Sequence, residues 1–295
     1  MEIDYSAFCH QGASFKVEYS ALPTGVELLT VIFTPPEPFD APPVIFIPGL
    51  ASVIENFRET VIELTRHHTV YYLETREKKS AVINGQHRFT VEDITSDLVH
   101  FTGIRFPSGP GYVMAGYSLG ATAIAEAFRL LDNKPEKIVL IEPNISFPFQ
   151  GWLLFLAGAA RVIYYPLKPF LKWYLRRFRI NLAEDYEMYR INCRILDSAE
   201  PVRLGAAIRH LSGYRMSACL QGISVPALVV VASKDKFHNH DEGTEIARQI
   251  NGARYIDLAD NRRTHSSEMG RIISDFISSP VKTASQAGQL WQDIS

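Results

Sequence analysis

Short apolar runs recur along the chain, and several of them are nearly continuous in Val, Ile and Leu. Runs of this kind are typical of strands that are covered on both faces, as in a parallel sheet. The pattern predicts eight strands, at residues 15–20, 26–34, 43–49, 69–75, 112–117, 137–143, 227–233 and 253–259.

Amphipathic patterns with helical spacing lie between most of these strands. They predict helices at residues 53–67, 91–102, 119–131, 241–249 and 266–278. Alternation of strands and helices implies right-handed crossovers and an α/β fold in which helices flank an open sheet. No helix separates the first two strands, so we expect an antiparallel start to a mostly parallel, eight-stranded sheet.

One long segment, residues 144–221, breaks this alternation, because its pattern indicates helices and turns but no strand. It is too long for an ordinary connection between two strands. We therefore expect a core made of residues 1–143 and 222–280, a helical cap at residues 144–221 inserted after the sixth strand, and a polar tail at 281–295. A cap in this place would cover the edge at which open α/β sheets bind ligands.

The composition is typical of a soluble globular protein and argues against several other classes. Hydrophobic residues make up 46% and charged residues 21%, as in soluble globular proteins, and the net charge of −2 gives no reason to expect a nucleic-acid partner. The three cysteines form no C-x-x-C pair, so neither a disulfide framework nor a zinc site is indicated. The first residues do not resemble a signal peptide, and the longest apolar run outside the strands, residues 152–160, is too short to span a bilayer. We expect a cytoplasmic protein.

The fifth predicted strand ends in Gly-Tyr-Ser-Leu-Gly, residues 116–120, and a helix follows at once. A serine at such a sharp turn takes up a strained backbone, so Gly116 and Gly120 have to be small. The turn also opens a helix, and its backbone N–H groups face the side chain of Ser118. By chance the pentapeptide occurs in roughly one chain in ten of this length, so its position after the strand carries the argument.

Four features together resemble the α/β-hydrolase superfamily over residues 26–279. They are PGLAS after the third strand, GYSLG after the fifth, Asp235 after the seventh and His265 after the eighth. The resemblance implies the α/β-hydrolase fold and a serine that attacks an ester, thioester or amide carbonyl. It requires no metal and no organic cofactor.

A serine hydroxyl becomes a good nucleophile only when a base takes its proton. The resemblance assigns that role to His265, and it assigns to Asp235 the support of the imidazolium. Glu142, at the end of the sixth strand, is the alternative acid, because some branches of the superfamily place their acid there. The resemblance also assigns the two oxyanion donors to the backbone N–H groups of Leu50 and Leu119.

Three features depart from the family pattern or stand outside it. Pro48 precedes Gly49 where the family commonly has His-Gly, and the loop ETREKKSA after the fourth strand lacks the usual glycines. His238 and His240 have an H-x-H spacing, but nothing else completes a metal site. We predict no metal site and assign no function to the ETREKKSA loop.

The start of the predicted cap has an unusual composition. Residues 143–183 include no acidic residue, six basic residues and ten aromatic residues. The basic residues are Arg161, Lys168, Lys172, Arg176, Arg177 and Arg179. This mixture fits a surface that meets lipid, or a tunnel mouth that admits a long acyl chain beside a phosphate-bearing carrier, and it also fits a solvated helix over the sheet. Candidates for substrate contact are Trp152, Phe155, Tyr164 and Tyr165.

The sequence thus predicts a serine hydrolase with a helical cap, of the esterase, monoacylglycerol-lipase-like or thioesterase type. Its partner would be a small or lipid-like acyl substrate, with peripheral membrane contact through the cap as a hypothesis. Two alternatives stay open. One is an acyltransferase with the same triad, and the other is a ligand-binding protein of the same fold without catalysis.

Overall fold

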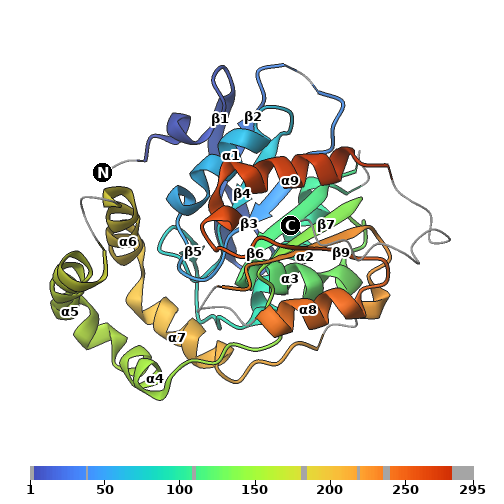
Figure 1. Ribbon diagram of the computed structural model, residues 1–295. Helices are drawn as coiled ribbons and strands as arrows, with labels where there is room; N and C mark the ends of the chain where they lie inside the picture. The colour runs from blue at the N-terminus through green and yellow to red at the C-terminus, as the bar shows by residue number, and fades with distance from the viewer. Residues whose placement is uncertain are drawn as a thin grey trace.

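The computed structural model describes residues 3–37, 39–107, 111–180, 185–217, 220–234 and 240–280. Their strands form one sheet in the order β1-β2-β4-β3-β6-β7-β8-β9, with β5 paired to β2 (Figure 1). The strands are β1 (Ser14–Ala21), β2 (Val26–Thr34), β3 (Val44–Ile47), β4 (Val70–Leu73), β5 (Val82–Ile83), β6 (Val113–Tyr117), β7 (Lys137–Ile141), β8 (Ala227–Val231) and β9 (Arg254–Asp257).

All eight predicted strands are present, and the sheet is antiparallel only where β2 pairs with β1, β4 and β5. From β4 through β3, β6, β7 and β8 to β9 every pair is parallel. The strand that the sequence did not predict, β5, has two residues, which is too short for a periodic pattern.

Helices cover both faces of the sheet. One face packs against α2 (Val91–Arg105), α3 (Leu119–Ala127) and α8 (His240–Gln249), and the other against α1 (Arg58–Leu64) and α9 (Ser267–Ser278). Successive β3 residues alternate between these two cores, because side chains of a strand point to opposite faces. This two-sided burial explains why the strands are continuous apolar runs in the sequence.

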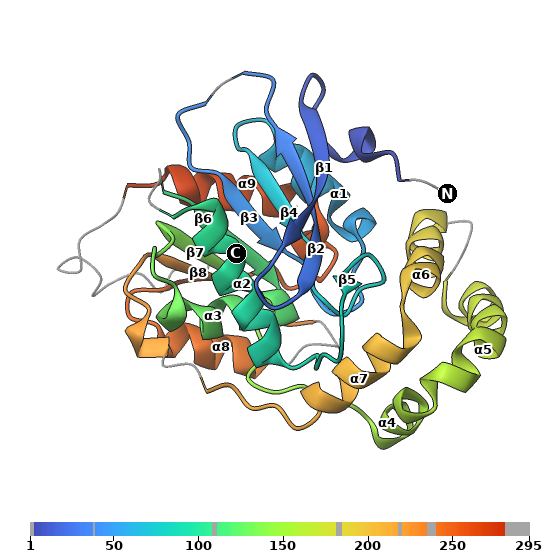
Figure 2. The same cartoon turned by 180° about the vertical axis from the view of Figure 1, so that it is seen from behind.

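The long segment between β7 and β8 forms helices at one side of the molecule (Figure 2). We call residues 144–221 the insert. Its helical elements are α4 (Gly151–Gly158), α5 (Ala160–Tyr174), η4 (Leu175–Arg179), α6 (Tyr186–Ser198) and α7 (Pro201–Leu211). Within the described residues, no helix has both the length and the apolar character that a membrane span requires.

Two carboxylates of the core hold the two ends of the insert. Glu242, at the start of α8, accepts hydrogen bonds from the backbone N–H groups of Ile145 and Ser146, at 2.7 and 3.1 Å. Glu126 of α3 accepts bonds from the Tyr214 hydroxyl and the Ser217 N–H, at 2.6 and 2.7 Å. Burial and the bond to Glu126 raise the pKa of Tyr214, so its hydroxyl stays a donor. The insert is therefore fixed to the core where it begins and ends.

A buried lysine caps the carboxyl end of α9. Lys137, at the start of β7, is 5% exposed, and its ammonium donates to the carbonyls of Phe276, Ile277 and Ser279 at 2.9, 2.7 and 2.6 Å. These carbonyls belong to the end of α9, where backbone acceptors lack partners within the helix. Burial lowers the pKa of Lys137, but the three acceptors keep the ammonium in place.

We expect Lys137→Met to lower the free energy of unfolding by about 2 kcal/mol or more, since three acceptors at the end of α9 lose a charged donor. Thermal and urea unfolding followed by circular dichroism measure the change. Lys16→Met is the matched control, because the Lys16 side chain is 71% exposed and should change stability by less than about 0.5 kcal/mol. Equal effects of the two variants would contradict this role of Lys137.

Candidate active site

Ser118 is the single residue between the end of β6 and the start of α3, and its backbone angles are φ 51° and ψ −114°. A non-glycine residue in this region costs about 1–3 kcal/mol and persists only where its surroundings hold it. Its N–H donates to the Ile141 carbonyl at 2.8 Å, and its carbonyl accepts from the Thr122 N–H at 2.9 Å. Both neighbouring elements thus fix the serine in the strained turn that the sequence predicted.

Glycine is required on both sides of this turn. A Cβ on Gly116 would lie 2.7 Å from the Ala121 nitrogen, and one on Gly120 would lie 2.3 Å from the Ile47 carbonyl oxygen. Distances this short cannot be relieved by moving a side chain, because backbone atoms are involved. The turn therefore depends on close contact between α3 and the ends of β6 and β3.

Positive φ values gather at the carboxyl edge of the parallel strands. Besides Ser118, the non-glycine residues with φ above zero in the described chain are Ala51, Glu142 and Ala259, at 57°, 49° and 60°. They follow β3, β7 and β9. Open α/β sheets bind ligands at this edge, and strained residues concentrate at functional sites.

His265 ends the short helix η6 (Arg263–His265) and reaches the same edge. Its Nδ1 lies 3.1 Å from the Asn261 carbonyl oxygen. Because a carbonyl only accepts, this bond places the proton on Nδ1 and the lone pair on Nε2. The imidazole also stacks on the Phe57 ring at 5.2 Å and meets the Tyr117 ring edge-on at 4.5 Å. The carbonyl therefore favours the tautomer that a general base needs, and the two ring contacts hold the orientation of the imidazole.

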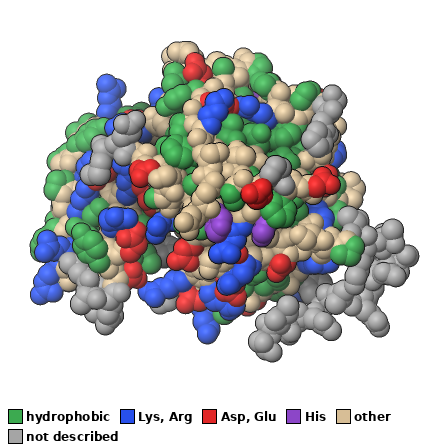
Figure 3. All heavy atoms as spheres, turned by 90° about the horizontal axis from the view of Figure 1, so that it is seen from above, with side chains coloured by type: hydrophobic (Ala, Val, Ile, Leu, Met, Phe, Trp, Pro, Cys, Tyr) green, Lys and Arg blue, Asp and Glu red, His purple; other side chains and the backbone are tan. Residues whose placement is uncertain are grey.

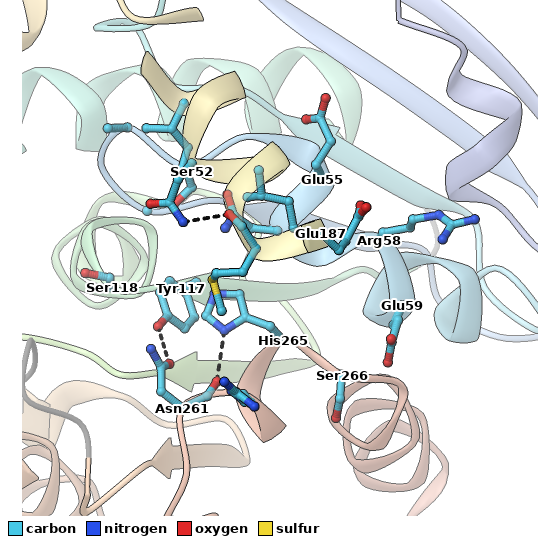
Figure 4. A pocket seen from close by; sticks show the side chains of 18 of the residues that line it. Ser52, Glu55, Arg58, Glu59, Tyr117, Ser118, Glu187, Asn261, His265 and Ser266 are labelled. Carbon is cyan, nitrogen blue, oxygen red and sulfur yellow. Dashed lines mark hydrogen bonds between the residues drawn. The ribbon is translucent and has the colours of Figure 1, made fainter. Parts of the chain in front are cut away.

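Ser118 and His265 both line a cleft of about 650 Å³ (Figure 4). The core side also includes Leu50 in the loop after β3 and Tyr117 at the end of β6. The opposite side is α6, which contributes Glu187, Met188, Ile191, Asn192 and Ile195. The cleft thus lies between the carboxyl edge of the sheet and the insert.

The loop after β3 lies directly against the serine. A Cβ on Gly49 would be 3.3 Å from the Ser118 Cβ and 3.2 Å from the Ser52 hydroxyl. Leu50 follows in the cleft wall, and Leu119 is the first residue of α3. The two residues assigned as oxyanion donors are therefore neighbours of Ser118, one along the chain and one in the adjacent loop after β3.

The two candidate acids differ in what the structure describes. Asp235 and His238 lie outside the described residues. Glu142 follows β7, is 2% exposed and is not part of the cleft wall. Its backbone N–H donates to the Val230 carbonyl at 2.8 Å, so it is held between β7 and β8.

The four aromatic residues proposed for substrate contact do not line this cleft. Trp152, Phe155 and Tyr165 are exposed. The Tyr164 hydroxyl donates to the Leu196 carbonyl at 2.6 Å, and burial raises the pKa of Tyr164 to about 12. The apolar residues of the insert that do face the cleft are Met188, Ile191 and Ile195.

Asn144, which the sequence analysis did not single out, contacts the serine. Its side-chain amide donates to the Ser118 Oγ at 3.2 Å and to the Glu142 carbonyl at 3.1 Å. Its position just past β7, the strand next to β6, is the signal that could have found it, since neighbouring strand ends meet at one edge. Asn261, four residues before His265, is a second residue that only the structure shows.

The ETREKKSA loop after β4 supports the loop after β3. Lys78 is buried, and its ammonium donates to the carbonyls of Gly49, at 3.4 Å, and Ser52. Arg203 of α7 donates to the carbonyls of Lys78 and Ala81 at 3.1 and 2.7 Å. The loop that departs from the family pattern therefore connects the insert to the wall of the cleft.

The same loop is anchored to α2 by a buried ion pair. The Arg76 guanidinium donates to both carboxylate oxygens of Asp97, each at 2.6 Å. Burial raises the pKa of Asp97, and the Arg76 guanidinium opposes that rise. Separation of the two side chains would leave buried charges without a partner, which is unfavourable. The ion pair therefore holds the loop against α2.

The described residues contain no group of three or more His, Cys, Asp or Glu side chains that could hold a metal ion. His240 contacts the Tyr255 hydroxyl at 2.9 Å through Nε2. The cleft wall offers a hydroxyl, an imidazole and amides, together with carboxylate and guanidinium groups; the charged residues are Glu55, Arg58, Glu59, Glu187 and Arg262.

We expect Gly120→Ala to reduce both stability and any activity of the cleft, because its Cβ would push α3 away from β3. The free energy of unfolding should fall by about 1–3 kcal/mol, as for overpacking in a core. Gly103→Ala in α2 is the matched control, since nothing lies within 4 Å of its Cβ, and it should raise stability by about 0.5–1 kcal/mol. Chemical unfolding measures both, and an unchanged Gly120→Ala protein would contradict the steric argument.

Solved structures similar to this chain share its fold. An enol-lactonase from Burkholderia xenovorans aligns with a TM-score of 0.74 at 19% identity, over 89% of this chain and 100% of that one. An esterase from Exiguobacterium antarcticum aligns with a TM-score of 0.71 at 11% identity, over 90% and 100%. A thermophilic esterase from Thermogutta terrifontis aligns with a TM-score of 0.67 at 17% identity, over 89% and 98%.

No family model and no curated protein sequence matches the chain. At these identities the structural likeness carries the fold and not the substrate. It covers the sheet and its flanking helices nearly from end to end, in agreement with the motifs GYSLG and PGLAS. The chain has the α/β-hydrolase fold.

Proposed function

We propose that this protein is a serine hydrolase that cleaves carboxylic esters or thioesters, with Ser118 as nucleophile and His265 as base. The observation that carries the proposal is the strained turn of Ser118 in a cleft that also holds His265. The similar enol-lactonase and esterases are named for hydrolysis of esters, which supports the same reaction class.

In the first half of the reaction the Ser118 hydroxyl attacks the substrate carbonyl while its proton passes to Nε2 of His265. The N–H groups of Leu50 and Leu119 stabilise the oxyanion of the tetrahedral intermediate. The intermediate collapses when His265 returns the proton to the leaving oxygen or sulfur. The products of this half are an alcohol or thiol and an acyl ester on Ser118.

In the second half a water molecule attacks the acyl ester, and His265 takes its proton. Collapse of the second intermediate releases the carboxylic acid and returns the proton to Ser118. Asp235 stabilises the imidazolium in both halves, and the Asn261 carbonyl, which accepts from Nδ1, orients the ring. Asn144 places the hydroxyl for attack through its amide, which donates to Oγ.

The acyl group of the substrate packs against α6. Met188, Ile191 and Ile195 lie at intervals of three and four residues, so they form one apolar stripe that faces the cleft. A cleft of about 650 Å³ accepts a ligand of medium size. Glu59 and Arg262, also in the wall, offer a polar site for the other part of the substrate.

Hydrolysis of p-nitrophenyl esters of rising acyl length tests the proposal. We expect turnover that increases beyond the acetate, and a loss of at least about a thousandfold in Ser118→Ala. Ile195→Trp should move the preference to shorter acyl groups, while Val202→Trp on the surface of α7 should not.

The matched control for the nucleophile is Ser212→Ala, which removes the hydroxyl of a serine that closes α7 away from the cleft. It should keep full activity. Absence of ester and thioester hydrolysis by the folded protein, or full activity of Ser118→Ala, would contradict the proposal.

The acid of the triad is tested by a pair of isosteric variants. We expect Asp235→Asn to lower kcat by about 10⁴, as loss of the orienting carboxylate does in serine hydrolases, and Glu142→Gln to keep most of kcat. Steady-state kinetics with one ester measure both. The reverse outcome would make Glu142 the acid.

A further inference from the structure

The outer helices of the insert expose large apolar side chains to solvent. Phe155 and Val162 are each 75% exposed, and Trp152 is 62% exposed. Tyr165, Phe170 and Trp173 are also more than half exposed. We call these six residues the outer face. A soluble protein rarely shows a contiguous patch of this kind unless something covers it.

Four residues of the outer face lie on α5, and the other two, Trp152 and Phe155, lie on α4. In α5, Val162, Tyr165 and Trp173 are separated by three and eight residues, so they share a side of the helix. The opposite side of α5 is half-buried, and there the Tyr164 hydroxyl bonds to Leu196 of α6. The side of α5 that carries Tyr164 therefore faces α6, and its aromatic side faces outward.

The charge on this surface is positive. No acidic residue occurs at positions 143–183, although the whole chain has a net charge of −2. Lys168 and Lys172 pair with Asp197 of α6 at 3.2 and 2.7 Å. Arg161, Arg176 and Arg177 are exposed beside the outer face.

The outer face lies at the edge of the molecule, where a flat surface can reach it. Figures 1 and 2 show α4 and α5 farther from the sheet than α6 and α7. Figure 3 shows hydrophobic, basic and acidic side chains together at the end of the molecule where the insert lies. Proteins that bind membrane surfaces commonly place aromatic rings at the level of the lipid headgroups and basic side chains around them, as this surface does.

We propose that the outer face docks on an anionic lipid surface, with its aromatic side chains at the headgroup level and Arg161, Arg176 and Arg177 on lipid phosphates. A second copy of the chain is the competing occupant of an apolar face. Isologous contact would bring each positive rim against its own copy, which opposes such a dimer. Docking does not depend on the proposed hydrolysis, since none of the six residues lines the cleft.

Co-sedimentation of the full chain with vesicles tests the proposal. We expect binding to vesicles of phosphatidylcholine and phosphatidylglycerol in equal parts, and much weaker binding to phosphatidylcholine alone. Reversal of the three arginines (Arg161→Glu, Arg176→Glu and Arg177→Glu together) should lower partitioning by at least about a hundredfold, at roughly fivefold for each of the three positive charges lost near the surface. High salt should lower it as well.

The matched control reverses three exposed arginines of the core, Arg129, Arg248 and Arg271, and so has the same net charge. It should bind nearly as the unchanged protein does. Circular dichroism and thermal unfolding establish that both triple variants are folded.

Insertion of the aromatic side chains has its own readout. The chain has three tryptophans, so Trp291→Phe leaves Trp152 and Trp173 as the emitters. Their fluorescence should shift to shorter wavelength with anionic vesicles and be quenched by brominated lipid.

Three results would overturn the proposal. They are no binding of the unchanged protein to anionic vesicles, equal loss of binding in the two triple variants, and a stable dimer in light scattering that Trp152→Ser and Trp173→Ser abolish.

Discussion

The backbone of Ser118 is held at φ 51° and ψ −114° by the close packing of α3 against β6 and β3. That strain costs about 1–3 kcal/mol, and the surrounding sheet offsets it. Gly120 lets the first turn of α3 approach the end of β3, and the Ser118 N–H is bound by the end of β7. Parallel strands covered on both faces make this edge rigid, so the serine, the loop after β3 and the turn before His265 keep a fixed relation.

The insert has two kinds of surface, and they suit two different tasks. Its ends are fixed to Glu242 and Glu126, and α6 is tied to the core by the ion pair of Arg194 with Glu55 at 3.1 Å. Helix α6 therefore forms a fixed wall of the cleft. Helices α4 and α5 lie outside it and have almost no buried side chains. Under our proposals the inner wall contacts the acyl group, while the outer face meets lipid.

Much of the fold could be predicted from the sequence. Buried parallel strands appear in it as continuous apolar runs, and the turn at Ser118 requires glycines on both sides for steric reasons. The two-residue strand β5 could not be predicted, since it has no pattern. The sequence left open whether Trp152, Phe155 and Tyr165 face substrate, lipid or solvent, and in the structure they are exposed and do not line the cleft. An amphipathic helix shows which residues share a side, but not whether that side faces a cleft or solvent. Asn144 and Lys78 act through loop geometry, which spacing alone does not reveal.

The central claim is that the strained turn presents the Ser118 hydroxyl in the cleft, where His265 activates it as a nucleophile. Labelling with a fluorophosphonate, followed by mass spectrometry of the peptides, tests it most directly, because the probe forms a stable adduct only with an activated serine. We expect one adduct on Ser118 and its loss when His265 is replaced by Ala. A folded protein without an adduct at Ser118, or with equal labelling in the two proteins, would contradict the account.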